Sequence, residues 1–154
     1  MCQYSAENGL MNDWHFQHLS QFGFSGAGLV MIESTAVENI GRITHNCTGI
    51  YDDECLSSIK TIMEKVKALS LNDVKFGIQL GHAGRKASTQ RPWEGRSYLR
   101  HNQNPWKTIA PSAIPFDKDW PIPKEMNDDD LQRVKTAFID AIRRSIKAGF
   151  DLIE

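Results

Sequence analysis

The chain has 154 residues, of which 40% are hydrophobic, and it carries a formal net charge of -1 at pH 7. This balance gives no electrostatic reason to expect a nucleic acid or a membrane surface as a partner. No apolar run approaches the ~20 residues that span a bilayer, and the first residues lack the basic and apolar regions of a secretion signal, so we expect a cytoplasmic protein.

The first residues carry reactive side chains where a domain usually has dispensable ones. The opening stretch MCQYSAENG contains a thiol and a phenol and ends in a turn-forming Glu-Asn-Gly segment. The next stretch predicts a helix over 13–22, with Asp13 as its N-cap. One face of that helix is predicted to carry Trp14, His18 and either Phe22 or Leu19. His15 and His18 are spaced to share a metal ion, although surface or packing roles are far more common for such a pair.

An apolar run closed by a carboxylate follows, GLVMIES over 28–34, and it predicts a buried strand. After a polar loop, Asp52 and Asp53 favour the start of a helix. The apolar face of this helix is predicted to consist of Leu56, Ile59, Met63, Val66 and Leu69. Asn72 and Asp73 are expected to turn the chain into the next strand.

A second buried strand is predicted over 74–80, and it ends in the polar and cationic segment GHAGRKA. Near its end lies Gln79, whose primary amide is costly to bury unless its donors and acceptor are matched. Two interpretations stay open. Gln79 hydrogen-bonds the backbone of a neighbouring loop, or it presents its acceptor and donor to a planar heterocycle such as the pyrimidine edge of a flavin.

The segment 87–126 contains all six prolines and three of the four tryptophans, and no helical or strand period persists in it. A stretch of this length inside a compact domain is typical of a functional loop or lid. Its arginines and aromatic residues resemble a single-strand nucleic-acid surface, but the overall charge balance argues against that function. We expect the aromatic residues to pack this excursion onto the scaffold or against a partner subunit.

The last helix is predicted to begin at Asn127, followed by three aspartates, and to run to Gly149. The aspartates are interpreted first as a helix-dipole feature, and only secondarily as a metal cluster. The apolar face is predicted to carry Leu131, Val134, Phe138, Ile142 and Ile146. A third strand is predicted to open at 150–154.

Strands and helices thus alternate, which is the order of a parallel α/β fold. A (β/α)8 barrel takes ~250 residues, so the chain would form part of one. A doubly wound sheet also satisfies the alternation, but no GxGxxG or P-loop follows a strand. Because no strand precedes Cys2 and the last strand is cut short, we expect a fragment truncated at both ends. The cysteines are odd in number and lack CxxC spacing, which indicates reduced thiols, and His45, Cys47 and Cys55 fit no common metal site.

Five ordered segments together resemble the old yellow enzyme family of flavin-dependent ene-reductases, and within it the xenobiotic reductase or YqjM-like branch. The segments are MCQYSAENG, GLVMIESTAVENIGRIT, GIQLGHAGRKAS with the following RPWEG, TIAPSAIPF and AGFDLIE. The resemblance implies a partial TIM (β/α)8 barrel, roughly strands 2 to 4 with their helices and a long Pro/Trp-rich loop after strand 3. It implies that 1–154 is the N-terminal part of an FMN-binding domain, with NADPH or NADH as the reductant.

The resemblance also implies roles for individual residues. Met1 and Cys2 would lie beside the flavin, where the thiol tunes its redox behaviour, and Tyr4 would contact the substrate. Ala36 would contact FMN, and Gln79 would read the pyrimidine edge of the flavin. His82 and Arg85 are interpreted as supporting residues. The substrate-polarising pair, the proton-donating tyrosine and the FMN phosphate site are expected beyond Glu154, so no catalytic residue is assigned within the chain.

The activity that the resemblance implies is reduction of activated C=C bonds in α,β-unsaturated carbonyl or nitro compounds. Hydride would pass in ping-pong fashion from the nicotinamide to FMN and then to the alkene, and the full-length enzyme would be a homo-oligomer. One alternative is a non-catalytic remnant or interaction fragment of the same fold. Another is a metal-dependent barrel hydrolase that uses Glu33 and His82 at strand ends.

Overall fold

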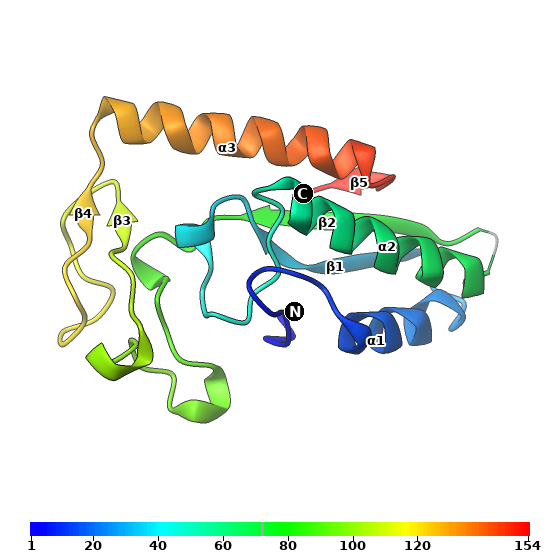
Figure 1. Ribbon diagram of the computed structural model, residues 1–154, viewed down its shortest axis with the longest axis horizontal. Helices are drawn as coiled ribbons and strands as arrows, with labels where there is room; N and C mark the ends of the chain where they lie inside the picture. Colours follow the sequence, from blue (N-terminus) through cyan, green and yellow to red (C-terminus); the bar gives the residue numbers. More distant parts are fainter. Residues whose placement is uncertain (72) are drawn as a thin grey trace.

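The computed structural model describes residues 1–71 and 73–154, so Asn72 of the predicted turn lies outside the described residues. Strands and helices alternate as the sequence predicts, and the short pair β3 and β4 lies within the long excursion (Figure 1). The elements are α1 (Asp13–Gly23), β1 (Leu29–Ala36), α2 (Asp53–Leu69), β2 (Lys75–Gly81), β3 (Ile109–Ala110), β4 (Lys124–Glu125), α3 (Asp128–Lys147) and β5 (Leu152–Ile153).

The main sheet is parallel and has the order β1-β2-β5, so the predicted parallel α/β fold is confirmed. The register of β1 against β2 shifts between Ile32 and Ser34, which marks a β-bulge at Glu33. A bulge adds one residue to a strand and so reverses the alternation of faces beyond it. Ser34 consequently lies on the same face as Met31, three positions earlier.

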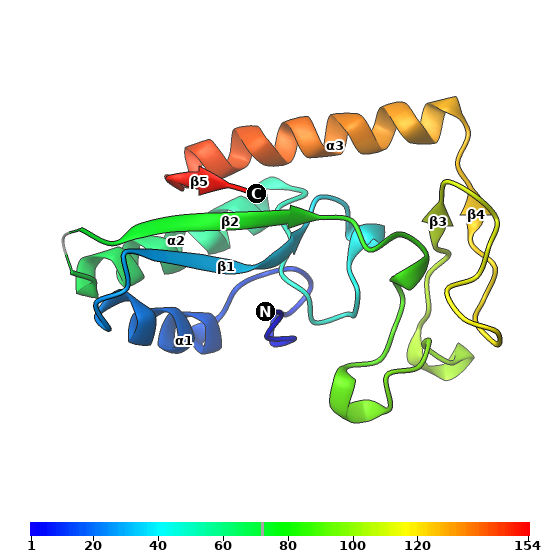
Figure 2. The same ribbon diagram turned by 180° about the vertical axis from the view of Figure 1, so that it is seen from behind.

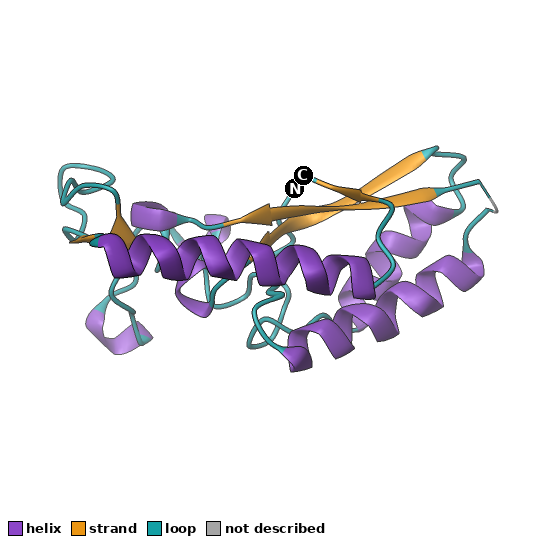
Figure 3. Cartoon of the chain, turned by 90° about the horizontal axis from the view of Figure 1, so that it is seen from above, coloured by secondary structure: helices purple, strands orange, loops and turns teal. Residues whose placement is uncertain are grey.

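The helices cover only one face of this sheet. In Figure 3 the strands lie to one side of the three helices, and in Figure 2 β1 and β2 lie in front of α2. The core forms between this covered face and the helices, and it includes Ile32, Phe76 and Ile78 of the sheet with Ile59 and Met63 of α2. The opposite face, which we call the open face, carries Met31, Gly77 and Leu152, because a Cβ on Gly77 would meet the other two side chains.

Helix α1 differs from its predicted form. Asn12, not Asp13, is the N-cap, and it forms a capping box with His15. The buried face carries His15 and Leu19, whereas Trp14 is 51% exposed. The predicted face is therefore wrong by about one residue, because the side chain of His15 points inward to the buried carboxylate of Glu33.

Helices α2 and α3 begin where the acidic residues predict, with Asp52 accepting from the Cys55 N–H and Asn127 from the Asp130 N–H. In α2 the predicted face is buried apart from its ends. In α3 it is not, because the side chains that the structure buries are Asp130, Ala141 and Ser145. The branched residues of the predicted face, such as Ile146 at 65% exposure, stay on the surface.

The segment 87–126, which we call the excursion, packs against the loop after β1 through Trp106. The indole N–H of Trp106 donates to the Ile40 carbonyl at 2.9 Å, the Arg42 guanidinium lies over its ring, and His45 packs edge-on against it. This contact agrees with the expectation that aromatic residues pack the excursion onto the scaffold. In Figure 1 the excursion extends beyond the carboxyl end of β2, so it lies beside the edge where parallel strands meet ligands.

Candidate functional site

The carboxyl end of the open face carries small and polar residues. Ser34 pairs in register with Gln79 and Ala36 with Gly81, and a Cβ on Gly81 would lie 2.7 Å from the Ser34 hydroxyl. All four residues therefore lie on the open face. A cavity of about 120 Å³ adjoins three of them, and its lining comes from Ser34, Ala36, Gly41, Arg42, Ile43, Cys47, Gly81, His82 and Ala83.

The first segment of the chain brings Cys2 to this edge. The half-buried thiol lies by the backbone of Ser34, and burial, with Cys47 and Glu33 nearby, raises the pKa of Cys2 to about 11. The thiol is therefore protonated near neutral pH. The side chain of Met1, by contrast, is fully exposed, so only the Met1 backbone can contribute to a site at this edge.

Tyr4 follows with a left-handed backbone, φ +52°, a conformation that costs free energy in a residue other than glycine. Burial and then the neighbouring Cys2 raise the pKa of the Tyr4 phenol. Its ring packs edge-on against Trp93 of the excursion, with 5.9 Å between ring centroids. Tyr4 thus lies between the strand ends and the excursion.

Gln79 is half-buried, and its amide N–H donates to the Glu154 carboxylate at 3.0 Å across β2 and β5. Its partner is thus the side chain of the residue that directly follows β5, which corrects the interpretation that a loop backbone satisfies it. In the part of the chain that the structure describes, no group donates a hydrogen bond to the amide oxygen of Gln79. An acceptor is therefore available on the open face.

The backbone of Ala36 is already occupied. Its N–H donates to the Thr48 carbonyl at 2.8 Å and its carbonyl accepts from the Ile50 N–H at 2.9 Å. Its methyl group remains for close packing against a ligand. The structure therefore brings Cys2, Tyr4, Ala36 and Gln79 to one edge of the sheet.

His82 and Glu33, which the sequence offered as metal ligands, have separate partners. Glu38 accepts from His82 at 3.1 Å and also pairs with Arg133, while His82 Nδ1 accepts from the Gly84 N–H. Burial lowers the pKa of His82. Glu33 instead pairs with His15. Among the described residues, no three histidine, cysteine or acidic side chains gather as a metal site.

Sequence reasoning missed the partners of Glu33 and His82. His15 showed only helical spacing in the sequence. Thr48, whose hydroxyl also donates to Glu33 at 2.7 Å, and Glu38 lie in loops without a period. The one available signal was a carboxylate that ends an apolar run.

None of the helices in the described ranges has the length and apolar composition needed to span a bilayer.

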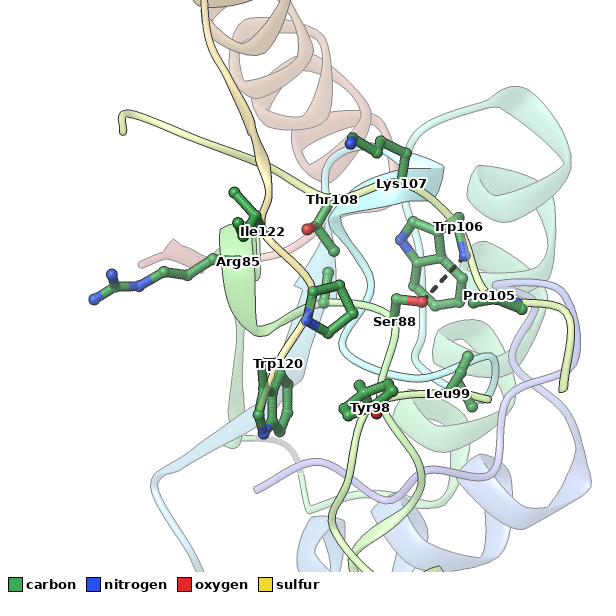
Figure 4. Close-up of a pocket in the computed structure, with 12 residues that line it drawn as sticks. Arg85, Ser88, Tyr98, Leu99, Pro105, Trp106, Lys107, Thr108, Trp120 and Ile122 are labelled. Atoms are coloured by element: carbon green, nitrogen blue, oxygen red, sulfur yellow. Dashed lines mark hydrogen bonds between the residues drawn. The ribbon is translucent and has the colours of Figure 1, made fainter. Parts of the chain in front are cut away.

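A second cavity of about 300 Å³ is lined mostly by residues of the excursion, together with Arg85 from the turn after β2 (Figure 4). Apolar walls come from Tyr98, Trp120 and Pro121. The Ser88 hydroxyl accepts from the backbone N–H of Trp106 at 3.1 Å. The charged ends of Arg85 and Lys107 point away from its centre. Its walls are mostly apolar, and the Ser88 hydroxyl already serves the excursion's own backbone.

The residues of the open face fit a flat heterocycle. Gly81 and Ala36 leave the carboxyl end of the face without bulky side chains, and Gln79 offers an amide acceptor there. A planar ring with an N–H at its edge matches this combination.

Comparison with known proteins gives a consistent result. The sequence matches the NADH:flavin oxidoreductase / NADH oxidase family over residues 1–154. It is 40% identical over 158 residues to an NADH:flavin oxidoreductase of Gibberella zeae, covering 100% of this chain and 38% of that protein. It is 38% identical over 156 residues to an NADPH dehydrogenase of Listeria monocytogenes, covering 100% of this chain and 41% of that protein.

Solved structures agree on the fold. Old Yellow Enzyme from Pichia sp. superposes with a TM-score of 0.79 at 23% identity, over 99% of this chain and 39% of that one. Morphinone reductase superposes with a TM-score of 0.77 at 20% identity, over 99% and 41%. The chain therefore has the fold of part of a (β/α)8 barrel, and it spans about two fifths of the length of the relatives it matches.

Proposed function

The chain belongs to the NADH:flavin oxidoreductase / NADH oxidase family, and on that premise we propose that the protein is an FMN-dependent oxidoreductase with NADPH or NADH as its reductant. The observation that carries the proposal is the small and polar carboxyl end of the open face, with Cys2 and Tyr4 beside it. Residues 1–154 then form the N-terminal part of the FMN-binding barrel domain.

Four positions of this chain would hold FMN: the Met1 backbone, the Cys2 thiol, the Ala36 methyl group and the Gln79 amide. Bound there, FMN supplies hydride transfer between the nicotinamide and a second substrate. Gln79 accepts a hydrogen bond from the edge of the ring and so fixes its orientation. Cys2 offers an S–H donor, because its raised pKa keeps it protonated near neutral pH.

The second substrate that we propose is an activated alkene, an α,β-unsaturated carbonyl or nitro compound. Negative charge grows on the oxygen of such a substrate during reduction, so hydrogen-bond donors must meet it. The Tyr4 phenol contributes contact at the rim, and its raised pKa keeps it in the donating form. A homo-oligomer of the full-length enzyme belongs to the same proposal.

The test follows the two half-reactions separately. Anaerobic protein with FMN is mixed with NADPH or NADH, and bleaching of the flavin absorption is recorded. The reduced protein is then mixed with a cyclic enone or with the corresponding saturated ketone. We expect reoxidation by the enone alone. Reduction without reoxidation by the enone would refute the alkene substrate, and absence of both steps would favour a non-catalytic chain of the same fold.

A further inference from the structure

The segment that carries Cys2 and Tyr4 belongs to no helix or strand of the structure. Its side chains can face a ligand reproducibly only if its backbone is held. Further along, the Ser5 carbonyl accepts from the Asn12 amide at 2.8 Å and the Ala6 N–H donates to the Asn46 carbonyl at 3.0 Å. Between Cys2 and Tyr4, the backbone N–H of Gln3 donates to the carboxylate of Glu33.

Glu33 is unusual because its carboxylate is buried, with 3% side-chain exposure, and yet fully engaged. One oxygen, Oε2, accepts from Gln3. The other, Oε1, accepts from the Thr48 hydroxyl at 2.7 Å and lies 3.2 Å from His15 Nε2. Since an ionised carboxylate only accepts, Nε2 of His15 carries the proton in this pair. A buried carboxylate with three donors avoids the cost of an unsatisfied charge.

The β-bulge explains how Glu33 reaches this position. Without it, Glu33 would lie on the open face by strict alternation, and Ser34 would face the helices. The extra residue turns Glu33 toward α1 and returns Ser34 to the open face. The bulge in β1 thus determines the direction of both side chains: Glu33 faces α1, and Ser34 lies on the open face.

We propose that Glu33 is a positioning residue that holds the Cys2–Tyr4 segment at the carboxyl edge of the sheet through the backbone N–H of Gln3. Naming Cys2 and Tyr4 as ligand-facing rests on the proposed function, whereas the anchoring itself does not. Glu33 touches neither reactant. It acts by limiting where the thiol and the phenol can be.

Three variants separate this hydrogen bond from charge and from general stability. Glu33→Gln keeps an oxygen acceptor for Gln3, because its amide NH2 group can face the Thr48 hydroxyl, which can accept as well as donate. Glu33→Met has a similar length but no oxygen acceptor. Both variants remove the negative charge, so any electrostatic effect on the Cys2 thiol is the same in each. Thr48→Val is the matched control, because it loses a contact to Oε1 and leaves the contact of Oε2 with Gln3.

The measurement is the rate at which Cys2 is alkylated by iodoacetamide, with each cysteine identified by peptide mass spectrometry. Cys47 and Cys55 are 2% and 0% exposed, so they report global unfolding in the same sample. We expect Glu33→Met to label at Cys2 about tenfold faster than Glu33→Gln, since a hydrogen bond to a charged or strongly polar buried group is lost. Thr48→Val should label like the unchanged protein, and Cys55 should stay protected in all four proteins.

Equal Cys2 rates in Glu33→Met and Glu33→Gln would overturn the proposal, and so would a Thr48→Val rate as high as that of Glu33→Met. Should Glu33→Met expose Cys55 as well, Gln3→Pro removes the same N–H from the donor side while the buried carboxylate stays intact. In that variant an unchanged Cys2 rate overturns the proposal and a faster rate with Cys55 protected supports it. The labelling needs no flavin, so failure here is distinguishable from failure of the proposed function.

Discussion

Among the residues at the proposed site, Cys2 has the side chain whose pKa is shifted furthest from its ordinary value. Its thiol pKa is raised to about 11 by burial first and by nearby Cys47 and Glu33 second. Because the raised pKa disfavours the thiolate, Cys2 is a weak nucleophile near neutral pH and is suited to hydrogen bonding.

We expect the alkylation rate of Cys2 to rise with pH through a midpoint near 11. At pH 8 the thiolate fraction should be about a hundredfold below that of a thiol with the ordinary pKa of 9, since each pH unit is a factor of ten. The rate at Cys2 is measured with iodoacetamide between pH 7 and 11, with a short unstructured cysteine peptide as the control. A midpoint at or below that of the peptide would contradict this electrostatic account.

Gln79 is predicted to contribute directly to FMN affinity. Gln79→Leu removes the amide oxygen that is available on the open face, and we expect the dissociation constant for FMN to rise about tenfold or more. Glu154→Gln is the matched control, because an amide oxygen at 154 still accepts from the Gln79 N–H. Quenching of FMN fluorescence during titration measures both. Equal affinities in Gln79→Leu and the unchanged protein would remove Gln79 from the site.

For Gln79 the sequence carried a signal, because a polar side chain at the end of a buried strand needs a polar partner or a ligand there. Cys2 had no such signal, and only the family resemblance placed it at the same edge. The sequence did not identify the partners of Glu33. The hydrogen bonds of Glu33 with His15 of α1 and with Thr48 of a loop depend on the bulge in β1, and a bulge has no periodic pattern in the sequence. The same holds for Glu38 and His82, which meet across two loops.

Among the elements, the start of α3 carries an ion-pair cluster around Asp130. Lys124, the Asn127 N–H and Arg133 hold the pKa of Asp130 down to about 2. A lowered folded-state pKa means that the stabilisation is present above the unfolded value near 4 and is lost as pH falls toward 2. Together with the pair of Glu38 and Arg133, this cluster ties the end of the excursion to the loop after β1.

Asp130→Asn should therefore lower the melting temperature at pH 6, and the difference from the unchanged protein should shrink as pH falls to about 2, where Asp130 is itself being protonated. Asp129→Asn is the control, because Asp129 lies exposed on the same first turn and contributes chiefly through the helix dipole. Melting is followed by circular dichroism across this pH range. A difference that does not depend on pH would show that Asp130 acts through capping geometry alone.

The elements themselves were largely predictable, since strands 28–34 and 74–80 and all three helices appear within about two residues of the expected ranges. The buried faces were less so. In α1 the capping histidine turned the helix. In α3 the periodicity of Ile142 and Ile146 marks a face that these 154 residues leave exposed. In a (β/α)8 barrel the helices form an outer ring in which each has neighbours, so we expect this face to be covered in a complete barrel.

For the whole molecule, the order of the sheet and its single covered face account for where the site lies. The strands of the main sheet are parallel, so their carboxyl ends meet at one edge, and the excursion and the first segment both converge there (Figure 2). The alternation of elements sufficed to predict the fold class. The shape of the excursion was not predictable, because single contacts such as that of Trp106 with Ile40, and no repeating pattern, determine it.

The most direct test of the account is a titration of FMN into the purified protein, recorded as a visible difference spectrum with circular dichroism on the same sample. If the carboxyl end of the open face binds the flavin ring, the flavin bands should shift on mixing, saturate with FMN concentration and weaken in Gln79→Leu. A folded protein that leaves the FMN spectrum unchanged would contradict the central claim that this edge of the sheet is a flavin site.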